Sequence, residues 1–398
     1  MTKQVANHLR MGVIAAAASI LCSTASAAPA DTTRVIVAFK PGAKMALKSV
    51  AAGANATVKK EIFGTDAVAM EVPRSALKGL ENNPNVDYIE EDHKRYAIAL
   101  TTPSTGNPYA TGQAVPYGIK QVQADLLSDI NTGNRKVCII DSGYDRAHED
   151  LSGNVHTGDY DAGTGNWYTD ENSHGTHVAG TIAAINNSGV GVVGVNANRR
   201  LQLHIVKVFS ASGWAYSSDL ASAANKCRAA GANIISMSLG GSGSSTTESN
   251  AFATLASANI LSIAAAGNAG NSSLSYPASY SSVVSVGAVD EYKQRASFSQ
   301  YNSQVELVGP GVSVYSTIPV SKGKYGYKSG TSMATPHVAA VAALVWSYYP
   351  SCSAAQIRST LGKSAQDLGS AGRDTRYGYG LVQAKAARDR IASLGCGN

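Results

Sequence analysis

The chain has few charged and few aromatic side chains for its 398 residues. Charged residues make up 15% and aromatic residues 7%, whereas apolar residues reach 44%, a composition that excludes a disordered chain. The net charge of +6 is small and not clustered, and no stretch alternates basic and aromatic residues. We therefore expect no nucleic-acid partner. The sequence also has no long internal repeat.

The chain has only one candidate for a targeting segment, at its N-terminus. Lys3 and Arg10 precede the apolar run "MGVIAAAASILC", which is too short to span a membrane comfortably. The small residues "ASA" follow, so residues 1–27 are predicted to be an export signal that is removed after its last residue. The alternative is a lipoprotein signal through Cys22, but the residue three positions before it is not leucine. No later segment resembles a membrane span, so we expect a secreted protein without a membrane partner.

Cysteine is scarce, with five residues in the whole chain. Removal of the signal leaves Cys138, Cys227, Cys352 and Cys396. An even number in an exported chain predicts two disulfides, for which three pairings are possible. The alternative is that Cys138 and Cys227 are free thiols, because both lie in apolar contexts where cysteine packs well.

The first part of the chain reads as a small α+β unit over about residues 32–92. "TTRVIVAFK" and "AVAMEVP" are predicted strands, and "SALKGLENNPNVDYIEED" is predicted to form a helix, a turn and a strand. The following stretch, "IALTTPSTGNPYATGQ", is rich in Thr, Pro, Gly and Asn and lacks periodicity. We expect it to be an exposed linker, which is where proteases cut.

From about residue 113 onward, short β-branched runs alternate with alanine-rich helical stretches. "KVCIID", "QLHIVKVF", "NIISMSL" and "VVSVGAVD" are examples of the first kind, and "HVAGTIAAI" and "HVAAVAALVWSYY" of the second. This alternation predicts an α/β fold with a parallel sheet that helices cover on both faces. Active sites of such folds lie at the carboxyl ends of the strands, so polar residues there are the candidates for chemistry.

Three stretches carry polar side chains at a strand end or at a helix start. Asp141 ends the apolar strand "KVCIID", where it either orients a partner or caps its own turn. His174 and His177 open the helix of "NSHGTHVAGTIAAI". A zinc site would need further ligands and a different spacing of the histidines. The remaining alternatives are a general base at His174 and two histidines that only pack or cap. Asn268 ends "SIAAAGN", and its amide either donates to an oxyanion or belongs to a common Gly-Asn turn.

A fourth candidate lies in "GTSMATPH". Ser332 precedes an apolar helix, so Thr331 or Ser332 is either an N-cap or, for Ser332, a nucleophile at a helix N-terminus. Pro336 is expected near the first turn, where a missing N–H costs least. An acid, a base, an amide donor and a serine together match the requirements of acyl transfer.

These stretches resemble a known family. "CIIDSGYDRAHEDL", "NSHGTHVAGTIAA", "MSLGG", "AAAGNAGN" and "SGTSMATPHVAAVAALV" closely resemble the signature stretches of subtilisin-like serine proteases, in the correct order, from about residue 113 to about residue 387. The N-terminal unit, with "RVIVAFK" and "VDYIEEDH", resembles the propeptide of the same family. The resemblance implies a signal peptide over 1–27, a propeptide over 28–111 and a subtilisin-like catalytic domain over 112–398.

The resemblance also implies roles for individual residues. Ser332 is the expected nucleophile, His174 the base that takes its proton, and Asp141 the group that orients the histidine. Asn268 is expected to donate to the oxyanion together with the Ser332 N–H. Three further residues match structural positions of the family and are given no catalytic role: His177, Asp145 and His337.

Substrate is expected to bind along small-residue strand edges. The residues that the resemblance implies for substrate binding are Ser238, Leu239, Gly240, Gly241, Ala265, Ala266, Gly267 and Ser275. These stretches contain no acidic residue, so we expect a broad endopeptidase that prefers apolar or aromatic residues before the cleaved bond. The alternatives are a restricted processing protease, which would need an acidic pocket or an added recognition domain, and a catalytically dead binding relative.

The resemblance implies a structural calcium site and an inhibitor. The calcium ligands would be Gln113, Asp150 and three residues of a loop one residue longer than usual, Ile185, Asn187 and Val192. The alternative is that this loop is an Asn-Asn-Ser-Gly turn without metal. The favoured disulfides are Cys138–Cys227 and Cys352–Cys396. The propeptide is expected to inhibit its own catalytic domain through a tail in the cleft and to be cut between about residues 97 and 112, leaving a monomer.

Overall fold

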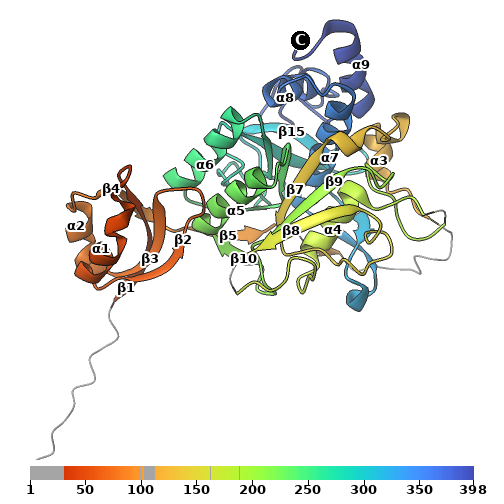
Figure 1. Ribbon diagram of the computed structural model, residues 1–398. Coiled ribbons are helices and arrows are strands. Elements are labelled where there is room, and N and C mark those ends of the chain that lie inside the picture. The colour runs from red at the N-terminus through yellow and green to blue at the C-terminus, as the bar shows by residue number, and fades with distance from the viewer. Residues whose placement is uncertain (1–30, 99, 103–112, 162, 188) are drawn as a thin grey trace, which may run out of the picture.

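The computed structural model describes residues 31–98, 100–102, 113–161, 163–187 and 189–398 (Figure 1). The predicted signal over 1–27, its lipoprotein alternative and residues 103–112 of the predicted linker lie outside these residues. No helix in the described part of the chain is long and apolar enough to cross a membrane.

The N-terminal unit is an antiparallel sheet with two short helices. Its strand order is β2-β3-β1-β4. Alternate residues of the central strand, Val35, Val37 and Phe39, point into a core with the helices, because successive side chains of a strand face opposite sides. The expected α+β unit is confirmed, although α1 and β2 were not predicted. The elements are β1 (Thr32–Phe39), α1 (Leu47–Gly53), β2 (Thr57–Glu61), β3 (Ala67–Pro73), α2 (Leu77–Glu81) and β4 (Val86–Glu91).

The larger domain is built on a seven-stranded sheet in which every pairing is parallel. The strand order is β15-β14-β13-β11-β7-β9-β8, so the direction of winding reverses next to β7. Ligand crevices of open α/β sheets lie at such a reversal, beyond the carboxyl ends of the strands. The strands are β7 (Lys136–Asp141), β8 (Val155–Tyr160), β9 (Gln202–Lys207), β11 (Ile234–Met237), β13 (Leu261–Ala265), β14 (Val283–Val289) and β15 (Val305–Pro310).

Helices cover both faces of this sheet, as expected for a parallel sheet. Val137 and Ile139 of β7 pack in one core with α4 and α7, whereas Cys138 and Ile140 pack in a second core with α5 and α6. Figure 1 shows α5 and α6 on the side of the sheet that faces the N-terminal unit. The helices are α3 (Tyr117–Gln121), α4 (His174–Ala183), α5 (Ser217–Ala229), α6 (Thr246–Ser257), α7 (Thr331–Tyr348), α8 (Ala354–Lys363) and α9 (Ala384–Leu394).

Two small antiparallel sheets join the segment after the N-terminal unit to the larger domain. One has the order β10-β5-β12 and the other β16-β17-β6. The prediction of an exposed linker is therefore wrong for residues 100–102, because these residues form β6 and pair with β17. The strands are β5 (Lys94–Ala97), β6 (Leu100–Thr102), β10 (Trp214–Tyr216), β12 (Leu239–Gly240), β16 (Val314–Thr317) and β17 (Tyr325–Ser329).

The long helix α7 runs through the core, and residues 331–347 are all buried. Pro336 lies inside this helix, one turn later than expected. A proline cannot donate to the carbonyl four residues earlier, which here belongs to Ser332. That carbonyl accepts a hydrogen bond of 2.7 Å from Ser238 Oγ instead. The proline thus frees a carbonyl that ties the start of α7 to β11–β12.

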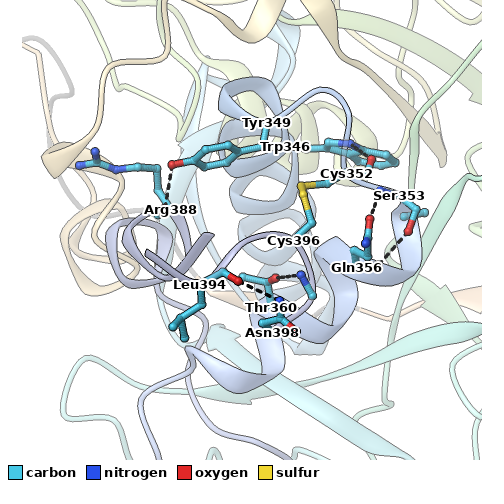
Figure 2. Close-up of a disulfide and its surroundings, with 12 residues drawn as sticks. Trp346, Tyr349, Cys352, Ser353, Gln356, Thr360, Arg388, Leu394, Cys396 and Asn398 are labelled. Carbon is cyan, nitrogen blue, oxygen red and sulfur yellow. Dashed lines mark hydrogen bonds between the residues drawn. A yellow bond between two sulfur atoms is a disulfide. The ribbon is translucent and has the colours of Figure 1, made fainter. Parts of the chain in front are cut away.

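Both disulfides have the favoured pairing. Cys138 of β7 is bonded to Cys227 of α5, with 5.7 Å between their Cα atoms, so the free-thiol alternative is wrong. Cys352 is bonded to Cys396, with 5.6 Å between their Cα atoms (Figure 2). The indole N–H of Trp346, near the end of α7, donates to the Cys352 carbonyl at 2.8 Å. This disulfide therefore joins the segment after α9 to the end of the core helix.

Candidate active site

Asp141 and His174 meet at the carboxyl end of β7. The Nδ1 of His174 lies 2.7 Å from Asp141 Oδ1, and the same oxygen accepts the Ser142 backbone N–H at 2.8 Å. The Asp141 side chain is fully buried and only 2% of the His174 side chain is exposed. Water therefore does not compete for this contact, and the carboxylate fixes the orientation of the imidazole. Asp141 orients a partner instead of only capping its own turn.

The start of α4 is held by a carboxylate that sequence reasoning missed. Asp170 Oδ2 accepts the Thr176 backbone N–H at 2.9 Å, and its Oδ1 accepts the Ser173 backbone N–H at 2.8 Å. Oδ1 also accepts the Ser142 hydroxyl at 2.8 Å, and that hydroxyl in turn accepts the Gly175 N–H at 2.9 Å. A carboxylate at a helix N-terminus satisfies free donors and complements the helix dipole. Asp170 thus links the strand end of Asp141 to the helix of His174.

Gly175 explains how the helix approaches the strand end so closely. A Cβ at this position would lie 2.2 Å from the carbonyl oxygen of Gly143. Any other residue would push α4 away from the turn after β7 and lengthen the contact between Asp141 and His174. The glycine next to the histidine in "SHGTH" is therefore required by packing.

Ser332 lies in the first turn of α7 and is fully buried. Its hydroxyl donates to the Ser238 carbonyl at 2.9 Å, and His174 Nε2 has no hydrogen-bond partner among the described residues. The Ser332 hydroxyl and His174 Nε2, the predicted nucleophile and base, therefore form no hydrogen bond with each other. Such bonds are often absent until substrate binds, so this geometry does not exclude acid–base catalysis.

The Asn268 side chain is oriented by the same turn of α7. Its Oδ1 accepts both the backbone N–H and the hydroxyl of Thr331, each at 2.9 Å. Its Nδ2 is therefore fixed to point the other way, where it donates to the Ile98 carbonyl at 3.1 Å. Thr331 is a positioning residue, and the Ser/Thr pair in "GTSM" is the signal that points to it. The amide is an oriented donor and not only part of a turn.

The three remaining polar candidates have structural partners. His177 Nε2 bonds to the Val314 carbonyl at 3.0 Å, and His337 Nδ1 to the Met333 carbonyl at 2.8 Å. Burial lowers the pKa of His337 to about 4 and that of His177 well below its ordinary value, so both imidazoles are neutral at pH 7. Asp145 accepts the Val320 backbone N–H at 2.7 Å. In the described part of the chain, no group of three His, Cys, Asp or Glu side chains could hold a metal ion.

Lys328 is a buried cation beside the site that sequence reasoning also missed. Its Nζ donates to the Ser173 hydroxyl at 3.1 Å. Burial lowers the pKa of Lys328, although the charges of Asp170 and Asp141 oppose that effect. No motif in the sequence marks this residue, because β17 reaches the site only through tertiary packing.

A segment of the chain itself occupies the cleft. β5 lies between β10 and β12, with Tyr96 opposite both Trp214 and Gly240. Ile98, which follows β5, accepts a hydrogen bond from the Asn268 amide through its carbonyl. Further along the chain, β6 pairs with β17. The tail of the N-terminal unit therefore crosses the cleft as an added strand, which is how extended peptides bind sheet edges.

A hollow of about 440 Å³ lies beside this segment, and Tyr96, Ala97 and Ile98 form part of its wall. Gly240, Gly241, Gly267 and Ser275 line it, as the resemblance implied. Ser238 and Leu239 are fully buried instead, and Leu239 pairs with Ala97 through its backbone. Ala265 and Ala266 are buried and are not among the lining residues, while Gln300, which was not predicted, is one.

The five residues expected to bind calcium converge around one point. Gln113 Nε2 donates to the Ile185 carbonyl at 2.8 Å, the Val192 carbonyl at 3.1 Å and Asn187 Oδ1 at 3.2 Å. Asn187 Nδ2 donates to Asp150 Oδ1 at 2.6 Å. Burial raises the pKa of Asp150, and its Oδ2 accepts the Val192 N–H at 2.9 Å. Three oxygens thus accept from the Gln113 amide, and the buried Asp150 carboxylate joins them through Asn187 and Val192. Carboxylate, amide and carbonyl oxygens are the ligand types that calcium prefers.

Comparison with known proteins places both parts of the chain. A profile of the subtilase family matches residues 132–380, and a profile of the fervidolysin N-terminal prodomain matches residues 32–92. Subtilisin E of Bacillus subtilis (strain 168) and subtilisin J of Geobacillus stearothermophilus are each 41% identical over 347 residues, which cover 85% of this chain and 85% of theirs. The crystal structure of Apa1, a psychrophilic subtilisin-like protease from Pseudoalteromonas sp. AS-11, superimposes with a TM-score of 0.67 at 37% identity, covering 71% of this chain and 99% of that one.

Proposed function

Because the chain belongs to the subtilase family, and is a subtilisin-like serine peptidase with an N-terminal prodomain, we propose that it is made as a self-cleaving precursor of a secreted endopeptidase. The cut is proposed at the Ile98–Ala99 peptide bond. This moves the border between propeptide and catalytic domain from 111/112, where the resemblance put it, to 98/99.

The contact between the Ile98 carbonyl and the Asn268 amide carries this proposal. A carbonyl that is to be attacked must lie at the donors that will stabilise its oxyanion. The Ile98 oxygen is 3.1 Å from such a donor, and the residues just before it pair with β12 while residues 100–102 pair with β17. No other carbonyl of the tail forms a hydrogen bond with this amide among the described residues, so Ile98 is the residue before the proposed cut.

The four residues then take the roles of an acyl transfer. The Ser332 hydroxyl turns from the Ser238 carbonyl towards His174, gives its proton to Nε2 and attacks the carbonyl carbon. Asp141 stabilises the imidazolium that forms. Asn268 Nδ2 and the Ser332 backbone N–H stabilise the oxyanion. His174 then protonates the leaving amine, and water hydrolyses the acyl-enzyme.

A serine-directed fluorophosphonate tests the nucleophile. We expect it to label the processed protein once, on the peptide that contains Ser332, and to abolish peptide hydrolysis. The Ser332→Ala protein should take up no label. Label on another residue of the active protein would contradict the proposed mechanism.

The proposed preference for an apolar residue before the cut rests on the surroundings of Ile98. A Cβ on Gly240 would lie 2.9 Å from Ile98 Cδ1 and 2.5 Å from Ser275 Oγ, so the side chain fills the space beside this glycine. No acidic residue lines this hollow in the described part of the chain. Peptides that differ only at this position should be cleaved faster with Phe or Leu than with Arg or Asp, and a clear preference for Arg would contradict this.

The propeptide is proposed to inhibit the enzyme until it is degraded. Glu90 accepts the backbone N–H groups of Thr246 and Thr247 at 2.6 and 2.9 Å, at the start of α6. Asp92 accepts the Ser218 backbone N–H at 3.0 Å, at the start of α5. Each carboxylate caps a helix of the other domain and complements its dipole. These contacts fasten the tail in the cleft.

A structural calcium ion is proposed at Gln113, Asp150, Ile185, Asn187 and Val192. The Gln113 amide can present its oxygen instead of its nitrogen to the common point, which would complete a set of oxygen ligands. The ion would neutralise the buried Asp150 carboxylate and so stabilise the fold. Chelation should lower the melting temperature of the Ser332→Ala protein, and added calcium should restore it; an unchanged melting temperature would contradict the site.

Secretion is proposed from the N-terminal pattern together with the disulfides. Cysteines that pair stably are a property of proteins in oxidising compartments. The two disulfides of the structure agree with such a compartment. Recovery of the protein from the culture medium, with a start after Ala27 or later, tests this.

A further inference from the structure

One residue of the tail enters a pocket of the larger domain that is not the hollow around Ile98. Arg95, on β5, has a fully buried side chain, and so does Glu248, on α6. Arg95 Nη2 lies 2.7 Å from Glu248 Oε2, and its Nε lies 3.2 Å from Oε1, so both oxygens of the carboxylate are used. Such a two-pronged pair is specific for the planar guanidinium.

The rest of the pocket is also built of hydrogen-bond acceptors. The Ser242 carbonyl accepts from Arg95 Nη1 at 3.1 Å, and the Gly243 carbonyl from Nη2 at 2.9 Å. Tyr280 donates its hydroxyl to Glu248 Oε2 at 2.7 Å and thereby orients the carboxylate. The pocket therefore offers a carboxylate and two carbonyls to a single guanidinium.

The two partners belong to different parts of the protein. Arg95 lies in the tail that the proposed function removes, whereas Glu248, Ser242, Gly243 and Tyr280 all stay with the catalytic domain. When the tail leaves, no cation remains beside Glu248 among the contacts that the structure describes. The pocket then offers a carboxylate and two carbonyls without a donor, and these acceptors fit another planar cation.

The position of Arg95 in the strand tells which substrate residue would fill this pocket. Arg95 lies three residues before Ile98, whose carbonyl contacts Asn268. The strand is held on both sides, with Arg95 opposite Ala215 and Ala97 opposite Leu239. A protein substrate that binds in the same register therefore places its fourth residue before the cut at Glu248.

We propose that Glu248 forms a second specificity pocket, which selects arginine at the fourth position before the cleaved bond of protein substrates. This inference rests on the proposed endopeptidase function. It adds an acidic subsite to an enzyme whose first subsite is apolar, and it favours cleavage at selected sequences over broad digestion. Glu248 lies outside the stretches from which the sequence predicted the pocket.

The test compares four peptides of the form acetyl-Xaa-Tyr-Ala-Ile-p-nitroanilide, in which Xaa is Arg, Lys, Leu or Ala. For the processed wild-type enzyme we expect kcat/KM to be at least about tenfold higher for Arg than for Ala, because charge-assisted hydrogen bonds are made. Lys should fall between them, since it lacks the fork. Equal rates for Arg and Ala, or the highest rate for Leu, would overturn the inference and leave the proposed function intact. No hydrolysis of any peptide would overturn both.

Two variants separate the pocket from general effects. Glu248→Gln should bring the ratio of Arg to Ala close to one while the Ala peptide is still cleaved. Glu306→Gln is the matched control. Glu306 lies on the edge strand β15, and it is also a buried carboxylate paired with an arginine, Arg358. This control should keep the full preference for Arg. A preference that survives in Glu248→Gln would overturn the inference, and if that variant does not fold, the wild-type comparison decides alone.

Discussion

Removal of the disulfide Cys352–Cys396 tests how the segment after α9 is held. The double substitution Cys352→Ser with Cys396→Ser opens a loop between residues 44 apart in sequence. Loop closure of that length gives a loss of about 4 kcal/mol in the free energy of unfolding. For a catalytic domain of about 300 residues, with an unfolding entropy of about 2.1 cal/mol/K per residue, we expect the melting temperature to fall by roughly 6 °C. The substitutions are made in Ser332→Ala, so that self-digestion does not contribute.

The assay is urea unfolding followed by tryptophan fluorescence. Trp346 reports on this site directly, because its N–H is bonded to the Cys352 carbonyl (Figure 2). The matched control removes Cys138–Cys227, which joins residues 89 apart and gives a loss of about 4.6 kcal/mol on the same reasoning. A loss below about 1 kcal/mol for the Cys352–Cys396 pair would refute the loop-closure argument.

Three further predictions concern single residues. Asn268→Ala should lower kcat by about 100- to 1,000-fold with little change in KM, a magnitude measured on a subtilisin and not worked out from this structure; a change confined to KM would contradict the role of an oxyanion donor. Gly240→Val should abolish cleavage of peptides with Ile or Phe before the cut, because even a Cβ would lie 2.9 Å from Ile98 Cδ1, the side chain at that position; unchanged peptide hydrolysis would show that substrate does not use this space. Lowering the pH from 6.5 to 4 should destabilise the Ser332→Ala protein, because the pKa of His337 is depressed to about 4 and the unfolded chain therefore binds the proton first. Protonation favours the unfolded chain by up to roughly 3 kcal/mol. Urea titrations at each pH would measure this loss, and His337→Asn should flatten the dependence of the unfolding free energy on pH.

The candidate site was predictable where the chemistry lies in short motifs. Asp141, His174, Asn268 and Ser332 each follow a strand or open a helix, and the parallel sheet brings such positions to one edge. The helix α7 was also predictable, because its long apolar run belongs in the core. The sequence did not show that the Ser332 hydroxyl bonds to a carbonyl of β11–β12, since that contact depends on packing.

Contacts between distant segments explain what sequence reasoning missed. β5 and β6 carry no strong pattern and form strands only because the cleft offers them partners. Asp170 reads as an ordinary loop acid, and only the fold brings it to the start of α4. Glu248 reads as an ordinary acid in the first turn of a helix, and only the tail shows that it faces an arginine.

The central claim is that Ser332 cuts the chain at Ile98–Ala99. The direct measurement is the intact mass and N-terminal sequence of the secreted wild-type and Ser332→Ala proteins, expressed in parallel. We expect a wild-type product that begins at Ala99 and a mutant that keeps its N-terminal domain. Equal processing of both proteins would contradict self-cleavage, and a wild-type product that retains residues before Ala99 would contradict the assignment of the Ile98 carbonyl.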